Sequence, residues 1–548
     1  MRLLDRRIGL LFAVFILLLG AASLRAAWLG TVKAGSFKQR ATTQQVEELE
    51  ITARRGTITD RNGVELAVSE DATTVFANPF LVKRPAAVAA RLAPIVELPP
   101  EELLEMLADR DKGFVYLGRK LDAGVGERVD KLAIEGIGTL SEPRRTYPQG
   151  ALAGQLLGSV GTDNDGLSGI EQQHEQTLHG SDGRRRLIKD ALGEPVSIVE
   201  PDRPEAGEDI QLTIDAALQE RVEAVMEEVG RTSRPRGATA VVMDPRNGEV
   251  LALSNWPRVD PNDVGGEASA EASTNRAVAA SYEPGSTFKA FTVAGALEEG
   301  LVTPATRFVL PPTLQVADRE IGESHERGTV ELSVADILAQ SSNVGAATIA
   351  LKLGARRFDK WVRRFGFGSP TGIGLPGEAP GIVLRPDDYS GSTLGNMAIG
   401  QGLAVTPIQM AAGFSALGNG GVLYPPHVIE AERGEGRRVI SQATSARVSS
   451  MLEGVLGPGG TAQEAEIPGY ALAGKTGTAE KPDPETGGYS KFKFFSSFIG
   501  FAPAKSPRLM VAVMVDEPQG QYYGSEVAAP AFERIVEFAL TYLRIPPG

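Results

Sequence analysis

The residues best suited to catalysis lie in the segment 283–289, which reads Glu-Pro-Gly-Ser-Thr-Phe-Lys. A turn at Pro284-Gly285 precedes apolar residues at helical spacing, so we expect Ser286 to lie in the first turn of a buried helix. Unpaired N–H groups at such a position favour a developing negative charge. Lys289 follows three residues later on the same helix face, and a desolvated lysine can take the proton of a serine hydroxyl. The alternative interpretation is an N-cap serine beside an exposed lysine.

A second segment, Ser341-Ser342-Asn343, follows a helical run that begins near Val334 and precedes another apolar helix. The hydroxyl of Ser341 and the carboxamide of Asn343 would therefore share a short loop. Such a pair can relay a proton from a leaving amine and hold a peptide amide. An ordinary helix cap is the alternative interpretation.

The third segment, Lys475-Thr476-Gly477-Thr478, follows an apolar, strand-like stretch. Its ammonium and hydroxyl groups would suit the carboxylate terminus of a substrate, and Gly477 would let a substrate backbone lie against the strand. An N–H of this strand could complete an oxyanion hole with that of Ser286. The run from Gly469 to Thr476 also matches the Walker A pattern. We reject a phosphate-binding loop, because the glycines and prolines that follow Lys475 cannot open a helix.

The composition argues against several other kinds of site. The 548-residue chain has no cysteine and only four scattered histidines, so we expect no metal and no cofactor. A histidine-based triad also lacks support, since no Gly-x-Ser-x-Gly elbow occurs. These exclusions favour lysine as the base. The net charge of −13 argues against a nucleic-acid partner.

The N-terminal segment predicts a membrane anchor. Ile8–Leu24 is an uncharged apolar run preceded by Arg2, Arg6 and Arg7. We favour an uncleaved single-pass helix within residues 1–30 over a removed signal peptide, because the small residues that follow are interrupted by Arg25. By the positive-inside rule, the N-terminus would be cytoplasmic and the remaining chain extracytoplasmic.

Two regions are predicted after the anchor. Residues 31–205 indicate an extended α+β module, a spacer or docking platform, that would start as a helix over 31–50. Within it, Asn62-Gly63 between two short alternating runs predicts a hairpin. Residues 206–548 indicate a second domain, and prolines cluster among charges at the boundary. Strand patterns in this domain occur at 210–214, 238–243, 249–253, 494–501 and 508–515, with helical patterns between them. Asp215 would cap the first of these helices, over 216–229. This order predicts an α+β fold, with one sheet built from distant segments and covered by helices.

Ser286-x-x-Lys289, Ser341-x-Asn343 and Lys475-Thr476-Gly477 occur in the order of the motifs of penicillin-binding proteins and serine β-lactamases. The segments 55–63, 145–148, 169–171 and 212–215 resemble the N-terminal module of the class B penicillin-binding proteins. The segments 400–407 and 515–518 resemble the septal division transpeptidases (FtsI-type) in particular. By resemblance, the chain is a class B penicillin-binding protein of the septal peptidoglycan D,D-transpeptidase type.

The resemblance implies both a fold and a reaction. The fold would be an N-terminal transmembrane helix, an α+β pedestal of the dimerisation type and a transpeptidase domain. That domain would combine a mainly antiparallel sheet, covering helices and an all-helical lobe. In the reaction, Ser286 would attack the carbonyl between two D-alanines of a stem peptide, and Lys289 would take its proton. The amine of a neighbouring stem would resolve the acyl-enzyme, and β-lactams would acylate the same serine.

The resemblance also assigns roles to the remaining motif residues. Ser341, assisted by Lys475, would pass a proton to the leaving amine, while Asn343 would hold the amide on the acyl side. Thr476 and Thr478 would bind the terminal carboxylate. The N–H groups of Ser286 and Thr478 would face the oxyanion.

The implied location is the bacterial cell membrane. The implied partners are peptidoglycan stem peptides that end in D-Ala-D-Ala, β-lactam antibiotics, a SEDS-type glycan polymerase and other divisome membrane proteins. Three alternatives stay open: an elongation-type class B transpeptidase, a membrane-tethered β-lactam sensor or β-lactamase, and a non-catalytic divisome scaffold.

Overall fold

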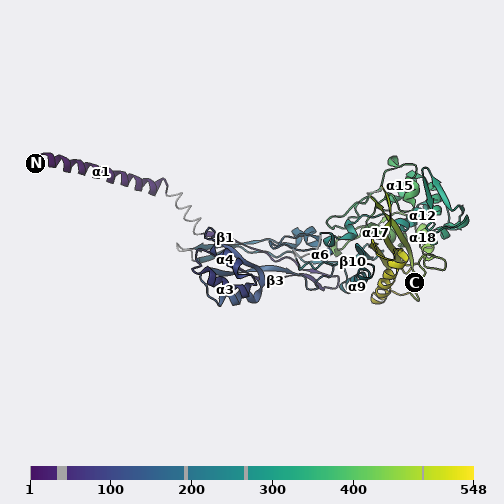
Figure 1. Ribbon diagram of the computed structural model, residues 1–548, viewed down its shortest axis with the longest axis horizontal. Coiled ribbons are helices and arrows are strands. Elements are labelled where there is room, and N and C mark those ends of the chain that lie inside the picture. Colours follow the sequence, from purple (N-terminus) through teal and green to yellow (C-terminus); the bar gives the residue numbers. More distant parts are fainter. Residues whose placement is uncertain (1, 34–45, 190–194, 264–269, 484–486, 548) are drawn as a thin grey trace.

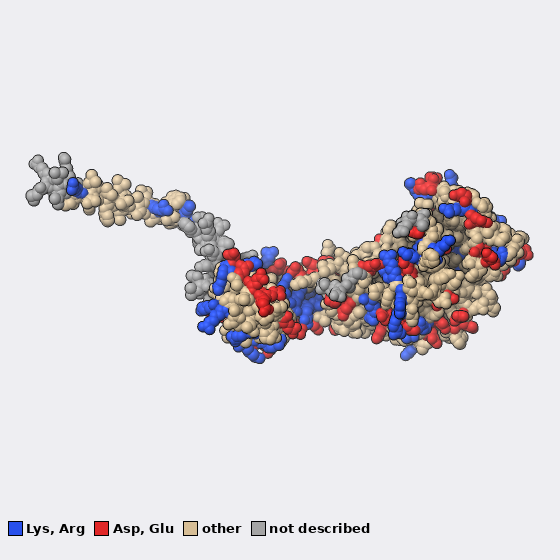
Figure 2. All heavy atoms as spheres, viewed as in Figure 1, with Lys and Arg blue, Asp and Glu red and all other residues tan. Residues whose placement is uncertain are grey.

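The structure of the protein is a computed structural model that describes residues 2–33, 46–189, 195–263, 270–483 and 487–547. It is elongated, with the N-terminal helix α1 (Arg2–Thr31) at one end and the C-terminal domain at the other (Figure 1). The stretch 7–31 has a mean hydropathy of 2.3, and it is long and apolar enough to cross a membrane. Figure 2 shows α1 as a tan stretch with basic side chains at both ends. The predicted anchor is thus one continuous helix, longer than the apolar run from which it was inferred.

The part of the pedestal nearest α1 has a hydrophobic core of its own. Strand β3 (Glu65–Ala77) pairs with both β4 (Val115–Asp122) and β5 (Ile137–Thr146), all antiparallel. Val75, Leu92, Leu103 and Leu117 are among the buried side chains of this core. Three helices pack on the strands: α3 (Pro85–Val96), α4 (Pro100–Ala108) and α5 (Ala123–Asp130). The hairpin predicted from Asn62-Gly63 is confirmed, because β2 (Ile58–Thr59) pairs with β3.

A three-stranded antiparallel sheet corrects the helix that we expected at 31–50. Strand β1 (Val46–Ile51) pairs with β6 (Gly183–Lys189), which pairs with β7 (Pro195–Asp202). Residues 46–50 are therefore extended, while 34–45 lie outside the described residues. The pairing partners are more than a hundred positions apart, so the local sequence could not reveal this strand.

The part of the pedestal that adjoins the C-terminal domain, which we call the neck, shares its hydrophobic core with that domain. Buried Ile58, Tyr147 and Ile170 belong to the same apolar cluster as Ile214 of that domain. The neck also buries Arg55 and Arg145, and both guanidinium groups are ion-paired with the buried carboxylate of Glu171. Its elements are β8 (Ile210–Gln211), α6 (Gly154–Leu157), α7 (Gly169–Gln173) and α8 (Glu175–Leu178). The neck and the C-terminal domain are consequently one packed unit.

The C-terminal domain is built on a five-stranded antiparallel sheet from distant segments, as predicted. The strand expected at 210–214 is not part of it, because β8 pairs with β2 of the pedestal. The strand order is β10-β9-β19-β18-β17, and β17 lies at one edge. Helix α9 (Ala216–Ser233), which is capped by Asp215, and the C-terminal α20 (Ala529–Tyr542) cover one face. Helix α17 (Pro407–Gly418) packs on the other face. The strands are β9 (Gly237–Met243), β10 (Val250–Trp256), β17 (Ala473–Asp483), β18 (Gly488–Ala502) and β19 (Leu509–Asp516).

The lobe between β10 and β17 is mainly, but not entirely, helical. The prediction of an all-helical lobe is wrong, because three two-stranded antiparallel ribbons join the helices. The ribbons pair β11 (Arg307–Leu310) with β14 (Val330–Ser333), β12 (Thr313–Val316) with β13 (Arg319–Gly322), and β15 (Val422–Leu423) with β16 (Arg437–Arg438). Strands of two to four residues are too short to show a period of two in a sequence.

The C-terminal domain has further helices and short helical turns, most of them in this lobe. They are α10 (Ala270–Ser273), α11 (Arg276–Ala279), η1 (Gly285–Phe288), α12 (Lys289–Glu298), α13 (Val334–Ala339), α14 (Asn343–Leu353), α15 (Ala355–Arg364), η2 (Pro386–Asp388), α16 (Thr393–Ala398), η3 (Glu430–Glu432), α18 (Gln442–Glu453) and α19 (Gly524–Val527). Among them, α12 is buried at every residue from Lys289 to Leu297. The turn that precedes it carries Ser286.

Candidate active site

A cavity of about 540 Å³ brings residues of the three sequence motifs together. Turn η1 contributes Ser286, the loop between α13 and α14 contributes Ser341 and Asn343, and edge strand β17 contributes Thr476 and Thr478. The other lining residues are Gly285, Ser324, His325, Gln340, Ile399, Gln401, Gly460, Thr461, Tyr523, Ser525 and Glu526. The motifs therefore meet across the sheet edge although they lie far apart in the sequence.

The turn before α12 fixes the position of the Ser286 hydroxyl. Gly285 has φ +55° and donates its N–H to Gly400 O at 3.0 Å. A Cβ at Gly400 would lie 2.1 Å from Gly285 O, so this close approach requires glycine. On the other side, the buried ring of Phe288 packs against Phe291 and Phe367. The serine is thus half-buried on a turn that is held from both ends.

Lys289 lies behind Ser286 and is almost fully buried, with an exposed fraction of 1 %. Its ammonium donates to Ser341 O at 2.6 Å, Asn343 Oδ1 at 2.6 Å and Ser341 Oγ at 3.2 Å. Burial lowers its pKa to about 7, against an opposing effect of the Glu323 carboxylate. A large fraction of this lysine is therefore neutral near pH 7. The hydrogen bonds described for Lys289 join it to the Ser-x-Asn loop rather than to Ser286.

The Ser-x-Asn loop is strained at Ser341, which has φ +61°. Ser342, between the two motif residues, caps α14 by accepting from Gly345 N at 2.9 Å. The capping role that we considered for the motif therefore falls to its middle residue. This leaves the Ser341 hydroxyl within reach of Lys289 and on the wall of the cavity.

Glu323 holds this loop and was missed in the sequence. Its carboxylate accepts from Ser342 Oγ at 2.6 Å and from Asn343 N at 2.7 Å, and it pairs with Arg327. The side chain is 8 % exposed. It lies in a charged run that looks like a solvated loop, and no spacing rule connects it with the later motif. Only the fold reveals its contact with α14.

Strand β17 contributes a second buried ammonium. Lys475 is fully buried, and burial together with the proximity of Lys289 lowers its pKa well below the usual range. It donates to Thr476 Oγ1 at 3.2 Å, and the same oxygen lies 2.7 Å from Thr461 Oγ1. Lys475 stands on a strand rather than at the start of a helix, so the rejection of a Walker A loop is confirmed.

Two β17 residues of the third motif also contact neighbouring elements. Thr478 Oγ1 accepts from Gly524 N at 2.9 Å. A Cβ at Gly477 would lie 2.4 Å from Ser497 Oγ and 3.1 Å from Pro284 O. The absent side chain of Gly477 thus lets β17 pack against the turn that carries Ser286, a different reason for glycine from the one that we expected.

Within the described ranges, one group of side chains could hold a metal ion by position alone. Ligand atoms of Asp165, Glu175 and His179 in the neck lie within 4.8 Å of one another. The Glu175 carboxylate is ion-paired with Arg55 at 2.9 Å, however, and none of the three residues lines the cavity at Ser286. A guanidinium on the carboxylate opposes a cation there.

Comparisons with known proteins agree with this geometry. Residues 50–212 match the penicillin-binding protein dimerisation domain, and residues 238–537 match the penicillin binding protein transpeptidase domain. The chain is 34 % identical to a probable peptidoglycan D,D-transpeptidase, PenA, of Neisseria meningitidis over 98 % of this chain and 92 % of that protein. It is 31 % identical to the peptidoglycan D,D-transpeptidase FtsI of Escherichia coli over 99 % and 92 %.

A solved structure is similar over most of the chain. Penicillin binding protein 3 of Mycobacterium tuberculosis, crystallised in complex with aztreonam, superposes with a TM-score of 0.71 at 29 % identity, over 91 % of this chain and 98 % of that chain. A dimerisation domain followed by a transpeptidase domain is thus shown by sequence and by fold. The chain belongs to the class B penicillin-binding proteins.

Proposed function

We propose that this protein is a serine-type peptidoglycan D,D-transpeptidase that cross-links stem peptides during septal wall synthesis. The observation that carries the proposal is the meeting of Ser286, the Ser-x-Asn loop and strand β17 at one cavity, with Lys289 buried on the turn of helix that follows Ser286. Burial lowers the pKa of Lys289 to about 7. A neutral amine at that position can accept the serine proton. His325 also lines the cavity, but its described ring contact is with Tyr523. Relatives named as D,D-transpeptidases over nearly the whole chain support the same reaction.

Acylation would start with attack of Ser286 Oγ on the carbonyl between two D-alanines. Lys289 takes the proton, and the N–H groups of Ser286 and Thr478 stabilise the oxyanion. Ser341, hydrogen-bonded to Lys289, returns a proton to the departing D-alanine amine with the assistance of Lys475. The hydroxyl groups of Thr476 and Thr478 bind the terminal carboxylate. An amine of a neighbouring stem then attacks the ester and releases Ser286.

Asn343 contacts both the base Lys289 and the substrate in this scheme. Its Oδ1 accepts from Lys289 at 2.6 Å, and its Nδ2 donates to Gly322 O at 2.9 Å. A carboxamide has two donor hydrogens and two acceptor lone pairs, so each end retains capacity for the amide on the acyl side of the substrate. Asn343 therefore positions the base while it holds the substrate.

The cellular arrangement follows from α1 and the pedestal. We propose that α1 anchors the protein in the bacterial cell membrane, with the N-terminus cytoplasmic because Arg2, Arg6 and Arg7 precede the apolar run. The pedestal and the catalytic domain would then be extracytoplasmic. A SEDS-type glycan polymerase and other divisome membrane proteins would dock along α1 and the pedestal.

Labelling with a fluorescent penicillin, followed by intact mass, tests the reaction. We expect a stable adduct of one drug per chain, which Ser286→Ala abolishes and Ser450→Ala, at an exposed serine, leaves unchanged. Rapid turnover of the drug would instead indicate a β-lactamase. A folded protein that does not label would indicate a scaffold. Depletion in cells should give filaments; rounded cells would indicate an elongation role.

A further inference from the structure

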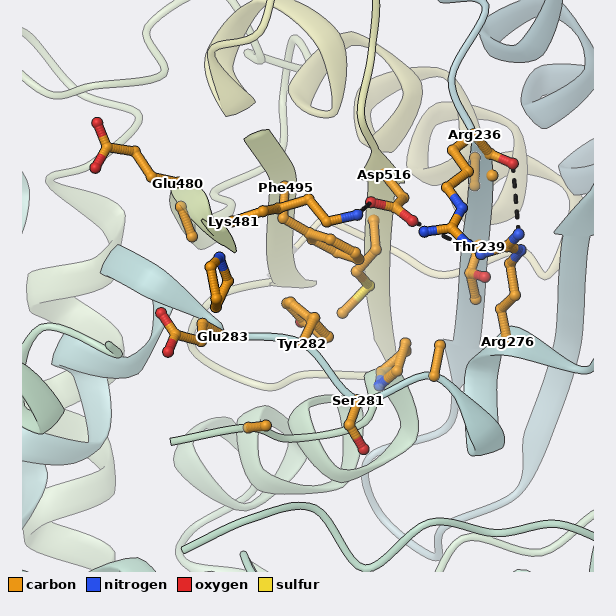
Figure 3. A pocket seen from close by; sticks show the side chains of 18 of the residues that line it. Arg236, Thr239, Arg276, Ser281, Tyr282, Glu283, Glu480, Lys481, Phe495 and Asp516 are labelled. Atoms are coloured by element: carbon orange, nitrogen blue, oxygen red, sulfur yellow. Dashed lines mark hydrogen bonds and ion pairs between the residues drawn. The ribbon is translucent and has the colours of Figure 1, made fainter. Parts of the chain in front are cut away.

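A second cavity, of about 610 Å³, shares three chain segments with the catalytic cavity. Figure 3 shows side chains that line this second cavity. Three chain segments separate the two cavities. In each segment, residues close together in the sequence line different cavities. Gly285, Gln401 and Thr478 face the catalytic cavity, whereas Glu283, Gly402 and Ala479 line the second one. On strand β17 this follows from the alternation of successive side chains. We call this second space the rear cavity; it has the size of a small-molecule site.

The middle of the rear cavity is apolar. The ring of Tyr282 stacks on that of Phe495, with centroids 4.1 Å apart and planes 17° apart. Figure 3 shows this pair between Glu283 at one end and Arg236 and Arg276 at the other. Leu403, Ala404, Ala479 and Met514 also line the space. A flat hydrocarbon group would therefore find a stacking surface here.

The cationic end of the rear cavity is already neutralised. Arg236 and Arg276 both pair with Glu271, at 2.7 and 3.1 Å, and Lys481 pairs with Asp516 at 2.6 Å. Each lysine and arginine described in the lining thus has a carboxylate partner. An anionic ligand would have to displace one of these carboxylates, so the charges do not favour phosphate or carboxylate ligands.

At the opposite end of the rear cavity, the Glu283 carboxylate can accept further hydrogen bonds. Glu283 Oε1 accepts from Gly402 N at 2.9 Å and from Tyr489 Oη at 3.2 Å. Its Oε2 is buried and has no hydrogen-bond donor among the described residues, and neither has the buried Tyr282 hydroxyl. A buried carboxylate oxygen without a donor is unfavourable, so a donor brought by a ligand would be stabilising. Burial also raises the pKa of Glu283.

We propose that the rear cavity binds a small amphipathic amine, with its ammonium at Glu283 and an aromatic or branched apolar group over the Tyr282–Phe495 pair. Because Glu283 lies three residues before Ser286 and accepts a hydrogen bond from Gly402, next to Gln401, the ligand touches two of the segments that form the catalytic wall. Occupancy therefore changes the rate at which Ser286 is acylated. The binding part stands on its own geometry, while the effect on acylation rests on the proposed function.

Tryptamine is a suitable probe, titrated against the full-length protein by calorimetry and by ligand-observed NMR. We expect saturable millimolar binding, as is usual for so small a ligand. Protein that was first acylated with ampicillin should bind equally well, because the drug fills only the catalytic cavity. The uncharged N-acetyltryptamine, or the variant Glu283→Gln, should weaken binding at least fivefold. The absence of saturable binding, equal affinity for the acetylated probe, or loss of binding after acylation would each overturn the proposal.

A filled cavity provides the matched control. Ala404→Phe, at a half-buried lining residue, should abolish binding, whereas Ala446→Leu on the exposed face of α18 should not. Ala280→Leu replaces Ala404→Phe if thermal melting shows that the latter is unfolded. Saturating tryptamine should change the acylation rate at least twofold in the unmodified protein and leave the filled variant unaffected. Binding without a rate change would overturn the coupling alone, and a protein that binds tryptamine but is never acylated would overturn the proposed function alone.

Discussion

Replacing Glu323 by glutamine should slow acylation and shift its pH dependence at the same time. The carboxylate accepts from Ser342 Oγ and Asn343 N, at 2.6 and 2.7 Å, and so holds the loop that supports Lys289. Glutamine keeps one acceptor oxygen but turns an NH₂ group toward one of these donors. A hydrogen bond to a charged group contributes about 1.5–3 kcal/mol, so we expect a loss of roughly 2–3 kcal/mol at the loop. If this appears fully in the barrier, acylation slows about 30- to 150-fold.

The pH profile separates this role from a general loss of structure. The Glu323 carboxylate raises the pKa of Lys289, which burial lowers to about 7. Removing the negative charge should lower that pKa further, so the neutral base persists to lower pH. The rate loss in Glu323→Gln should accordingly be smaller in acid than in alkali. Stopped-flow acylation by a chromogenic penicillin across pH 5–9 measures both quantities, with Glu326→Gln at an exposed neighbour as the control. A variant with a wild-type rate and an unshifted profile would refute the reasoning.

Three further predictions concern the base, the packing of the cleft and the neck. In the unmodified protein, acylation should rise with pH through about 7 and then level, because only the neutral form of Lys289 accepts the serine proton; a flat profile between pH 5 and 9 would contradict this. Gly477→Ala should destabilise the fold by about 1–3 kcal/mol and slow acylation, since its Cβ would lie 2.4 Å from Ser497 Oγ; unfolding by denaturant and acylation kinetics measure the two effects, and a neutral result would show that β17 can move away. Glu171→Ala should lower stability by about 3–5 kcal/mol, because it leaves the buried guanidinium groups of Arg55 and Arg145 without their shared carboxylate; calorimetry should show a lower melting temperature, and an unchanged one would mean that the network contributes little.

The elements that the sequence predicted correctly carry their signals locally. Asp215 lies directly before the apolar period of α9, and Asn62-Gly63 lies between two short alternating runs. Strand β1 carries no comparable signal, because it is stabilised by pairing with β6 far along the chain. The short ribbons of the helical lobe were missed because strands of two to four residues are too short to show a period of two.

The residues of the candidate site also differ in whether the sequence alone could identify them. Ser286, Lys289 and the two later motifs could be found because their residue types and spacings are distinctive. The structure brings residues of all three motifs to one cavity and buries Lys289 against the Ser-x-Asn loop. The contact of Glu323 with the N-terminus of α14 depends on how a ribbon loop packs, which no spacing encodes. The packing role of Gly477 was equally hidden, since it appears only when β17 lies against η1.

The central claim is that Ser286 forms an ester with a stem peptide and passes it to an amine. The most direct measurement uses a thioester analogue of a stem peptide ending in D-alanine, with a D-amino acid as acceptor, and follows intact protein mass and released products together. We predict a transient mass increase of one acyl group, located by peptide mapping at Ser286, and a product that contains the acceptor amine. An adduct that persists in Ser286→Ala would contradict the claim. So would a reaction that yields only the hydrolysed peptide although the acceptor is present.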